Sequence, residues 1–191
     1  MKQFIVAVSK ETPIRNLKRV PINSNLKGMV IPQADDVNKI IEFPLRVFEG
    51  YDTAEKIRNA IGFVNRQSSY YRQAAETLGL VEMLNGNKYG LTVLGNKLLK
   101  LTGTERATFV CKLLLQFPIL NDIFIEISSD RLKVMTQQDL EHLIRSKSNL
   151  TGNTVLRRSK TIIAWSRWIR NNLGIVEVSK NGTVRIAKNV I

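Results

Sequence analysis

The sequence predicts a mainly helical α+β protein with small β-hairpins, organised as a tandem winged helix-turn-helix. One observation is that residues 53–91 read in order as a helix, a tight turn, a second helix and a hairpin. Another is that this order returns in residues 131–191, where LGIVE at 173–177 echoes LGLVE at 78–82. In both places the glycine is expected to end a helix and the next residues to begin a strand, which indicates a structural repeat.

The distribution of charge points to a polyanionic partner. The 191 residues carry a net charge of +13, of which residues 1–30 hold +5 and residues 154–191 hold +7. The middle of the chain is nearly neutral, as expected when cations gather on a binding surface. A basic surface that only meets solvent is the alternative. An anionic membrane is disfavoured, because neither terminus contains a strongly amphipathic basic helix with an aromatic face.

Composition and cysteine content favour a cytoplasmic protein. Hydrophobic residues at 43% and charged residues at 24% are typical of a folded chain. No apolar run approaches the roughly 18 residues of a membrane span, and the apolar part of MKQFIVAVSKE is too short for a secretory signal. The single cysteine, Cys111, lies in an apolar helical stretch and fits a reducing compartment.

Residues 1–30 are expected to form an N-terminal strand and a basic arm. The strand is FIVAV at 4–8, and the arm, KETPIRNLKRVPINSNLKG, contains two prolines and little apolar periodicity. Its Arg15, Lys18 and Arg19 are predicted to follow a phosphate backbone or to enter a minor groove of DNA. A surface loop that wraps the domain is an equally good interpretation.

Residues 31–103 are expected to form the first winged-helix domain. Its first helix, within QADDVNKIIEFPLRVFEG, is predicted to kink or break at Pro44 and to end at Gly50. Its expected inward face consists of Val37, Ile40, Ile41, Leu45 and Phe48.

The helix-turn-helix and its hairpin follow in the same domain. The residues expected to cap or end its two helices are, in order, Asp52 or Thr53, Gly62, Asn65 and Gly79. The hairpin is predicted to turn at Asn85-Gly86-Asn87. A further helix is expected to begin after Thr92, with Leu94, Leu98 and Leu101 facing the core.

Residues 104–130 are expected to form a helical connector, and residues 131–191 the second winged-helix domain. Pro118 breaks the connector, whose first helix is predicted to bury Ala107, Val110, Leu113, Leu114 and Phe117. In the second domain Thr136 is expected to cap a short helix and Thr154 a long helix that ends at Gly174. Lys180-Asn181-Gly182 then forms the turn of a second hairpin.

DNA contacts are predicted on the second helix of each unit. This helix enters the major groove in helix-turn-helix proteins, and Arg and Gln side chains pair two-pronged with guanine and adenine edges. In the first unit, hairpin included, the predicted contacts are Arg66, Gln67, Ser69, Tyr70, Arg72, Gln73, Asn87 and Lys88. In the second unit they are Asn153, Thr154, Arg157, Arg158, Lys160, Thr161, Lys180 and Arg185.

Three groups of aromatic and acidic residues have simpler structural explanations. Trp165 and Trp168 are interpreted as core residues rather than as platforms for base stacking. Tyr70 and Tyr71 are adjacent on a helix, so only one of them is expected to be buried. The acids Asp35 and Asp36 suit a helix N-terminus better than a nuclease metal site.

Catalytic chemistry is not expected in this chain. Only one histidine and one cysteine are present, too few for a zinc site or a paired-histidine site. No GxxxxGK[ST] phosphate loop occurs either. The sequence therefore predicts no metal, no cofactor and no small-molecule ligand.

Four segments of the chain are similar to parts of one known module. They are IPQADDVNKIIEF, RQSSYYRQ, YGLTVLGNKLL and TVLRRSKTIIAWSRWIRNNLG, and together they resemble a winged-helix module of type II restriction endonucleases. The resemblance covers about residues 30–175. It implies sequence-specific binding of double-stranded DNA by a target-recognition region, with the nuclease in a separate fused or associated domain. Some such regions belong to modification-dependent enzymes and read methylated sites. This chain departs from a complete enzyme because it has no nuclease motif.

Two other functions remain open on the sequence. A stand-alone winged-helix transcriptional regulator would bind a palindrome as a dimer. A protein-interaction scaffold would use the same folds to dock a partner, and its positive charge would be incidental.

Overall fold

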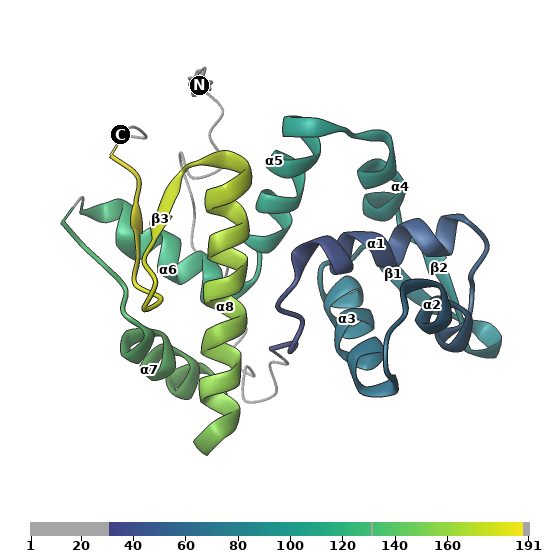
Figure 1. Ribbon diagram of the computed structural model, residues 1–191, viewed down its shortest axis with the longest axis horizontal. Coiled ribbons are helices and arrows are strands. Elements are labelled where there is room, and N and C mark those ends of the chain that lie inside the picture. Colours follow the sequence, from purple (N-terminus) through teal and green to yellow (C-terminus); the bar gives the residue numbers. More distant parts are fainter. Residues whose placement is uncertain (1–30, 131, 189–191) are drawn as a thin grey trace.

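The computed structural model describes residues 31–130 and 132–188, so the expected N-terminal strand and basic arm lie outside the described residues. The described chain is mainly helical with two small antiparallel hairpins, which confirms the α+β class (Figure 1). Its helices form two lobes. The first holds α1 (Val37–Phe48), α2 (Ala54–Ile61), α3 (Asn65–Thr77), β1 (Val81–Leu84), β2 (Lys88–Leu91) and α4 (Val93–Lys100). The second holds α5 (Gly103–Leu114), α6 (Pro118–Ser129), α7 (Gln137–Lys147), α8 (Gly152–Leu173), β3 (Val176–Val178) and β4 (Val184–Ile186).

Most helix ends of the first lobe are where the capping signals predict them. The Thr53 hydroxyl accepts a hydrogen bond from the Lys56 backbone N–H, and Gly62 ends α2 in the left-handed conformation. The expected cap at Asn65 is wrong by one residue. Val64 occupies the cap position, and its N–H is satisfied by the Gln67 side chain at 3.3 Å.

Helix α1 differs from its prediction in two ways. It continues through Pro44 without interruption, so of the predicted kink or break the break is wrong, and Phe43 and Pro44 are both buried. Their packing offsets the backbone hydrogen bond that proline cannot donate. The predicted inward face is also partly wrong, because Leu45 is 39% exposed and Phe48 is 68% exposed. The sequence VNKIIEFPLRVF offers two overlapping apolar stripes, and the core uses the one that contains Phe43.

Helix α4 packs closely on the first hairpin. Gly95 makes this approach possible, because a Cβ at this position would lie 2.1 Å from the carbonyl oxygen of Leu80. Leu98 is fully buried as predicted, whereas Leu94 is 36% exposed. In α5 the whole predicted stripe is buried, and Pro118 begins α6 as its first residue.

Of the two helices in the predicted connector, α6 is the most apolar helix of the described chain. Within residues 31–130 and 132–188, no single helix has the length and apolarity of a membrane span. Helices α5 and α6 reach that threshold only when taken together, across a bend of 102°.

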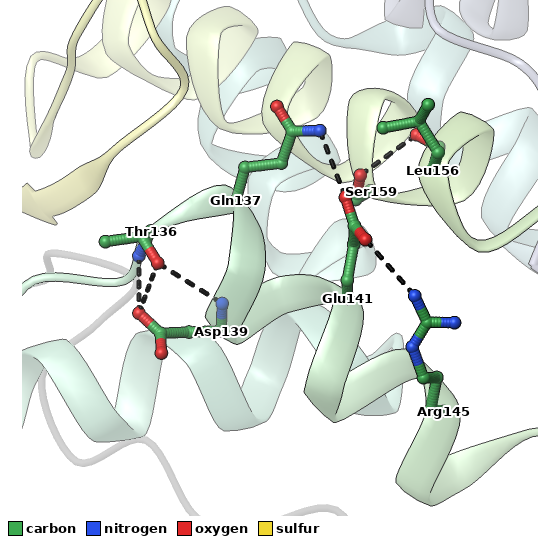
Figure 2. A network of polar contacts seen from close by, with 7 residues as sticks. All are labelled: Thr136, Gln137, Asp139, Glu141, Arg145, Leu156 and Ser159. Carbon is green, nitrogen blue, oxygen red and sulfur yellow. Dashed lines mark hydrogen bonds and ion pairs between the residues drawn. The ribbon is translucent and has the colours of Figure 1, made fainter. Parts of the chain in front are cut away.

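The second lobe begins its helix pair with a reciprocal cap (Figure 2). The Thr136 hydroxyl accepts a hydrogen bond from the Asp139 N–H at 3.2 Å, and the Asp139 carboxylate accepts one from the Thr136 N–H at 2.8 Å. Helix α8 starts earlier than predicted, since Thr151 rather than Thr154 occupies its cap position. Gly174 ends it in the left-handed conformation, as expected.

The two lobes repeat one order of elements, including a short strand pairing that the sequence did not predict. Thr53, just before α2, forms an isolated antiparallel bridge with Lys88, the first residue of β2. Met135, just before α7, forms the same bridge with Val184, the first residue of β4. In each lobe, a residue ahead of the helix pair thus joins the second strand of the hairpin.

Helix α8 belongs to the second lobe, lies on the side of it that faces the first lobe (Figure 1), and is hydrogen-bonded to both lobes. Trp165 is fully buried, as predicted, and its indole N–H donates to the Ala34 carbonyl at 2.7 Å. The Trp168 indole N–H donates to Asn38 Oδ1 at 2.9 Å. Because Ala34 and Asn38 lie at the start of α1, these bonds fix α8 against the first lobe.

Candidate nucleic-acid interface

The N-terminal half of α8 presents an exposed basic stripe. Asn153, Arg157 and Lys160 are exposed and follow the spacing of one helix face. The 22 residues of α8 include five Arg or Lys and no Asp or Glu. Neither Arg157 nor Lys160 has an acidic partner within 4.0 Å among the described residues. Their charges therefore remain available to an anion from outside the protein.

Arg158 points in another direction, toward the first lobe. Its Nη1 donates to Gln33 Oε1 at 3.2 Å, and its guanidinium lies 5.8 Å from the centroid of the Tyr70 ring. Desolvation lowers the pKa of Arg158, the nearby Tyr70 hydroxyl raises it, and the positive charges of Arg157 and Arg66 lower it. The side chain is therefore a half-buried cation in a positive environment.

A second arginine, from the same helix as Tyr70, also contacts this tyrosine. The Arg66 Nε donates to the Tyr70 hydroxyl at 2.6 Å, and the Arg66 guanidinium lies 5.6 Å from the ring centroid. The same ring thus contacts a cation from α3 and a cation from α8. We call these three residues, Arg66, Tyr70 and Arg158, the junction cluster.

The neighbouring Tyr71 is the buried tyrosine of the pair, as the sequence predicted that only one would be. Its hydroxyl donates to the Asp35 carboxylate at 2.9 Å and accepts from the Asp36 N–H at 3.3 Å. Burial, followed by the bond to Asp35, raises the pKa of Tyr71. Tyr71 is therefore a structural residue, and Tyr70 is the tyrosine that faces the junction.

A groove of about 550 Å³ lies between α3, the start of α1 and the second half of α8. Gln67 lines it from α3 and Arg167 from α8, with Asp35 and Asp36 at the start of α1. The predicted contact Gln67 therefore faces the same hollow as part of α8. The groove is thus a second place, besides the junction cluster, where residues of α3 and α8 lie near one another.

Several predicted contacts are already engaged within the protein. Arg72 donates to Glu76 at 3.4 Å and to the Tyr89 hydroxyl at 3.3 Å. Lys88 forms an ion pair with Asp52 at 2.9 Å, and Arg185 Nε donates to Glu177 at 2.8 Å. The other predicted contacts on exposed or half-exposed positions are Ser69, Gln73, Asn87, Thr154 and Lys180.

The prediction for Thr161 is wrong. Its side chain is 1% exposed, and its hydroxyl donates to the Arg157 carbonyl one turn earlier in α8. The sequence placed Thr161 with the polar face of the helix because it is polar. A hydroxyl group can instead donate its hydrogen bond to a backbone carbonyl of its own helix, which allows the side chain to be buried in the core. Arg15, Lys18 and Arg19 lie outside the described residues.

Three residues near the site were not predicted. Gln33 holds Arg158, but it lies 125 positions away in the sequence, and no local pattern connects them. Arg167 and Arg170 donate to backbone carbonyls of the second hairpin, at Lys180 and Val178, over 3.1 and 3.0 Å. Their position in the last turns of a helix that leads into a hairpin is a signal that favours such a role.

Metal chemistry has no site in the described part of the chain. No group of three or more His, Cys, Asp or Glu side chains is placed to hold a metal ion among residues 31–130 and 132–188. The single cysteine, Cys111, is fully buried, and burial raises the pKa of its thiol to about 12. This buried thiol is therefore in its protonated form at neutral pH.

Comparison with known proteins gives one match. Neither a curated protein nor a solved structure matches the chain. A family model matches residues 39–173, from the first turn of α1 to the last residue of α8, so that it includes all of α3 and α8. The chain belongs to this family, a domain of unknown function designated DUF7226.

Proposed function

We propose that this chain binds double-stranded DNA with sequence preference, using the exposed faces of α3 and α8 on one duplex. The exposed candidates for base contacts are Gln67 and Ser69 on α3 and Arg157 and Lys160 on α8. The remaining cations of these helices would lie near phosphates, where they position the protein without reading sequence.

We further propose that each lobe is a winged helix. The support is the shared order of a first helix, a bridging residue, a helix pair and a hairpin. In this interpretation α6 takes the place in the second lobe that α1 takes in the first, since α6 packs on α7 and β4 as α1 packs on α2 and β2, while α5 packs on α8. The recognition helices of the two units are then α3 and α8.

The biological setting proposed is a target-recognition region of a type II or modification-dependent restriction endonuclease. Its support is the resemblance of the RQSSYYRQ and TVLRRSKTIIAW segments to such regions. Nuclease activity would belong to a separate domain or subunit. A stand-alone regulator is the alternative, and it would use the same two helices.

The observation that carries the proposal is the meeting of α3 and α8 at the junction cluster. Arg66 and Arg158 approach one tyrosine ring, at 5.6 and 5.8 Å, although like charges repel. A DNA backbone supplies the closely spaced negative charges that such an arrangement accommodates. Two recognition helices held this close favour a single duplex over two separate ones.

Selection from a randomised duplex library, followed by fluorescence anisotropy at several salt concentrations, tests the proposal. Restriction-type recognition predicts a short or asymmetric motif bound by one copy of the chain. A palindrome bound by a dimer would favour the regulator instead. No binding to any duplex at low salt would exclude both and leave a protein-interaction scaffold.

The exposed stripe of α8 gives the corresponding mutational test. If Arg157 and Lys160 read bases, Arg157→Ala with Lys160→Ala should weaken binding of the selected duplex by about 1–3 kcal/mol per residue. If they bind phosphates instead, the double variant should lower the slope of the salt dependence by about 1 per residue. Lys112→Ala, which removes an exposed cation from α5, is the matched control and should have little effect. Unchanged affinity in the double variant would refute this assignment.

A further inference from the structure

Resting on the proposed function, we infer that the junction cluster is a phosphate site, in which Arg66 and Arg158 together hold one backbone phosphate of the bound duplex. Tyr70 is its positioning residue. The site would lie where the two units meet, so that a single phosphate is shared between them.

The hydrogen-bonding capacity of the two arginines supports this site. A guanidinium has five N–H donors. Arg66 uses its Nε on the Tyr70 hydroxyl, and Arg158 uses Nη1 on Gln33. The two Nη groups of Arg66 and Nη2 of Arg158 have no partner among the described residues. These are the groups that bind phosphate oxygens in charge-assisted bonds.

The electrostatic balance at the cluster also favours an anion. Arg66, Arg157 and Arg158 lie close enough for the charges of the first two to lower the pKa of the third. The acid of α3, Glu76, is already engaged with Arg72. No carboxylate within 4.0 Å of these three guanidiniums occurs among the described residues. Binding one phosphate would relieve this repulsion.

The anchoring of Arg158 favours a phosphate over a base edge. Its guanidinium is half-buried, and Gln33 and Tyr70 hold it at the boundary between the lobes. A side chain held in this way does not follow the exposed stripe of Arg157 and Lys160, so it does not reach the base edges at the floor of the DNA major groove. Phosphates approach the protein surface more closely and report no sequence. Arg158 should therefore contribute affinity equally to all sequences.

A methylphosphonate scan of the selected duplex tests this inference. Each substitution replaces one charged phosphate oxygen by a methyl group. We expect one sensitive phosphate, between the DNA segment contacted by α3 and the segment contacted by α8. A methylphosphonate at that position should weaken binding of the unmodified protein roughly ten-fold, because charge-assisted bonds cannot form there. In Arg66→Gln and Arg158→Gln, binding should be weaker on the unmodified duplex, and the same position should no longer be sensitive.

Further variants separate the role of each group. Tyr70→Phe keeps the ring but removes the hydroxyl that orients Arg66, so sensitivity should fall at this phosphate only. Arg158→Lys keeps the charge and should retain part of the sensitivity, which keeps the test valid if Arg158→Gln does not fold. Lys112→Gln is the control and should leave the whole profile unchanged.

The outcomes distinguish this inference from the proposed function. If the protein binds its duplex but the variants keep full sensitivity at every position, the phosphate site is overturned while DNA binding stands. The same holds if no position between the contacted segments is sensitive. If the unmodified protein binds no duplex, the proposed function fails, and the phosphate site fails with it.

Discussion

Asp52 lies between two lysines, and its carboxylate accepts a hydrogen bond from Lys56 and pairs with Lys88, each at 2.9 Å. The bond from Lys56, followed by that from Lys88, lowers the pKa of Asp52 from 3.8 to about 2. A carboxyl whose pKa is depressed on folding stabilises the protein above its unfolded pKa and loses this effect as the pH falls through its folded pKa.

Asp52→Asn should therefore have a pH-dependent effect on stability. We expect a small decrease in Tm at pH 6, because the two lysines lose their anion. The decrease should shrink as the pH falls from 3.8 through about 2, because Asp52 becomes protonated first in the unfolded state and then in the folded state. Thermal unfolding followed by circular dichroism between pH 2 and pH 7 measures this. A decrease in Tm that is the same at every pH would contradict the assigned pairing.

Individual residues also show how much of the site was predictable. The helical pattern placed Arg66, Arg157 and Lys160 on solvent-facing sides of their helices, and all three are exposed, while their contacts with DNA stay a prediction. The same pattern misplaced Thr161, because polarity alone does not tell a solvent-facing hydroxyl from one bonded to its own helix. The bond from Arg158 to Gln33 depends on the packing of two lobes, which no local pattern contains.

Helix α7 shows how a local signal determines an element. Thr136 and Asp139 satisfy each other's backbone N–H groups, and two further side-chain contacts lie along the same helix, from Gln137 to Glu141 and from Arg145 to Glu141 (Figure 2). Side-chain and backbone hydrogen bonds from Thr136 lower the pKa of Asp139. The cap was predictable because all of its participants lie within four residues.

Removing this cap tests its contribution. Thr136→Ala should destabilise the protein by about 1 kcal/mol, because the Asp139 N–H loses its acceptor at the first turn of α7. Thr136→Ser keeps the hydroxyl and should remain within a few tenths of a kcal/mol of the unmodified protein. Urea unfolding of the three proteins measures the difference. Equal destabilisation in both variants would show that the methyl group, and not the cap, matters here.

Helices whose neighbours come from the other end of the chain were predicted less well. The inward face of α1 was predicted partly wrong because its sequence is apolar on more than one side, and the choice between the two stripes depends on its packing against α2, α3 and β2. The start of α8 was missed by three residues, since Thr151 and Thr154 are equally good capping residues in isolation. The periodicity of apolar residues was enough to predict which segments are helices and strands. Which face of a helix is buried depends on contacts with the rest of the molecule.

At the scale of the whole molecule, α8 is the element that relates the two lobes. Its buried Trp165 and half-buried Trp168 bond to the start of α1, and its Arg158 reaches Gln33 and Tyr70. These contacts fix α3 and α8 relative to each other. The proposed recognition helices would consequently read two segments of DNA at a set separation, rather than moving independently as they would on a flexible linker.

Site-specific photo-crosslinking to the selected duplex tests most directly whether α3 and α8 bind one duplex together. A photoreactive residue is placed in separate variants at Ser69 of α3 and at Lys160 of α8, with Lys112 of α5 as the control position. We predict that the first two crosslink to the same duplex, at separate but fixed nucleotides, and that the control does not. A crosslink from only one of the two helices, or from neither, would contradict the account.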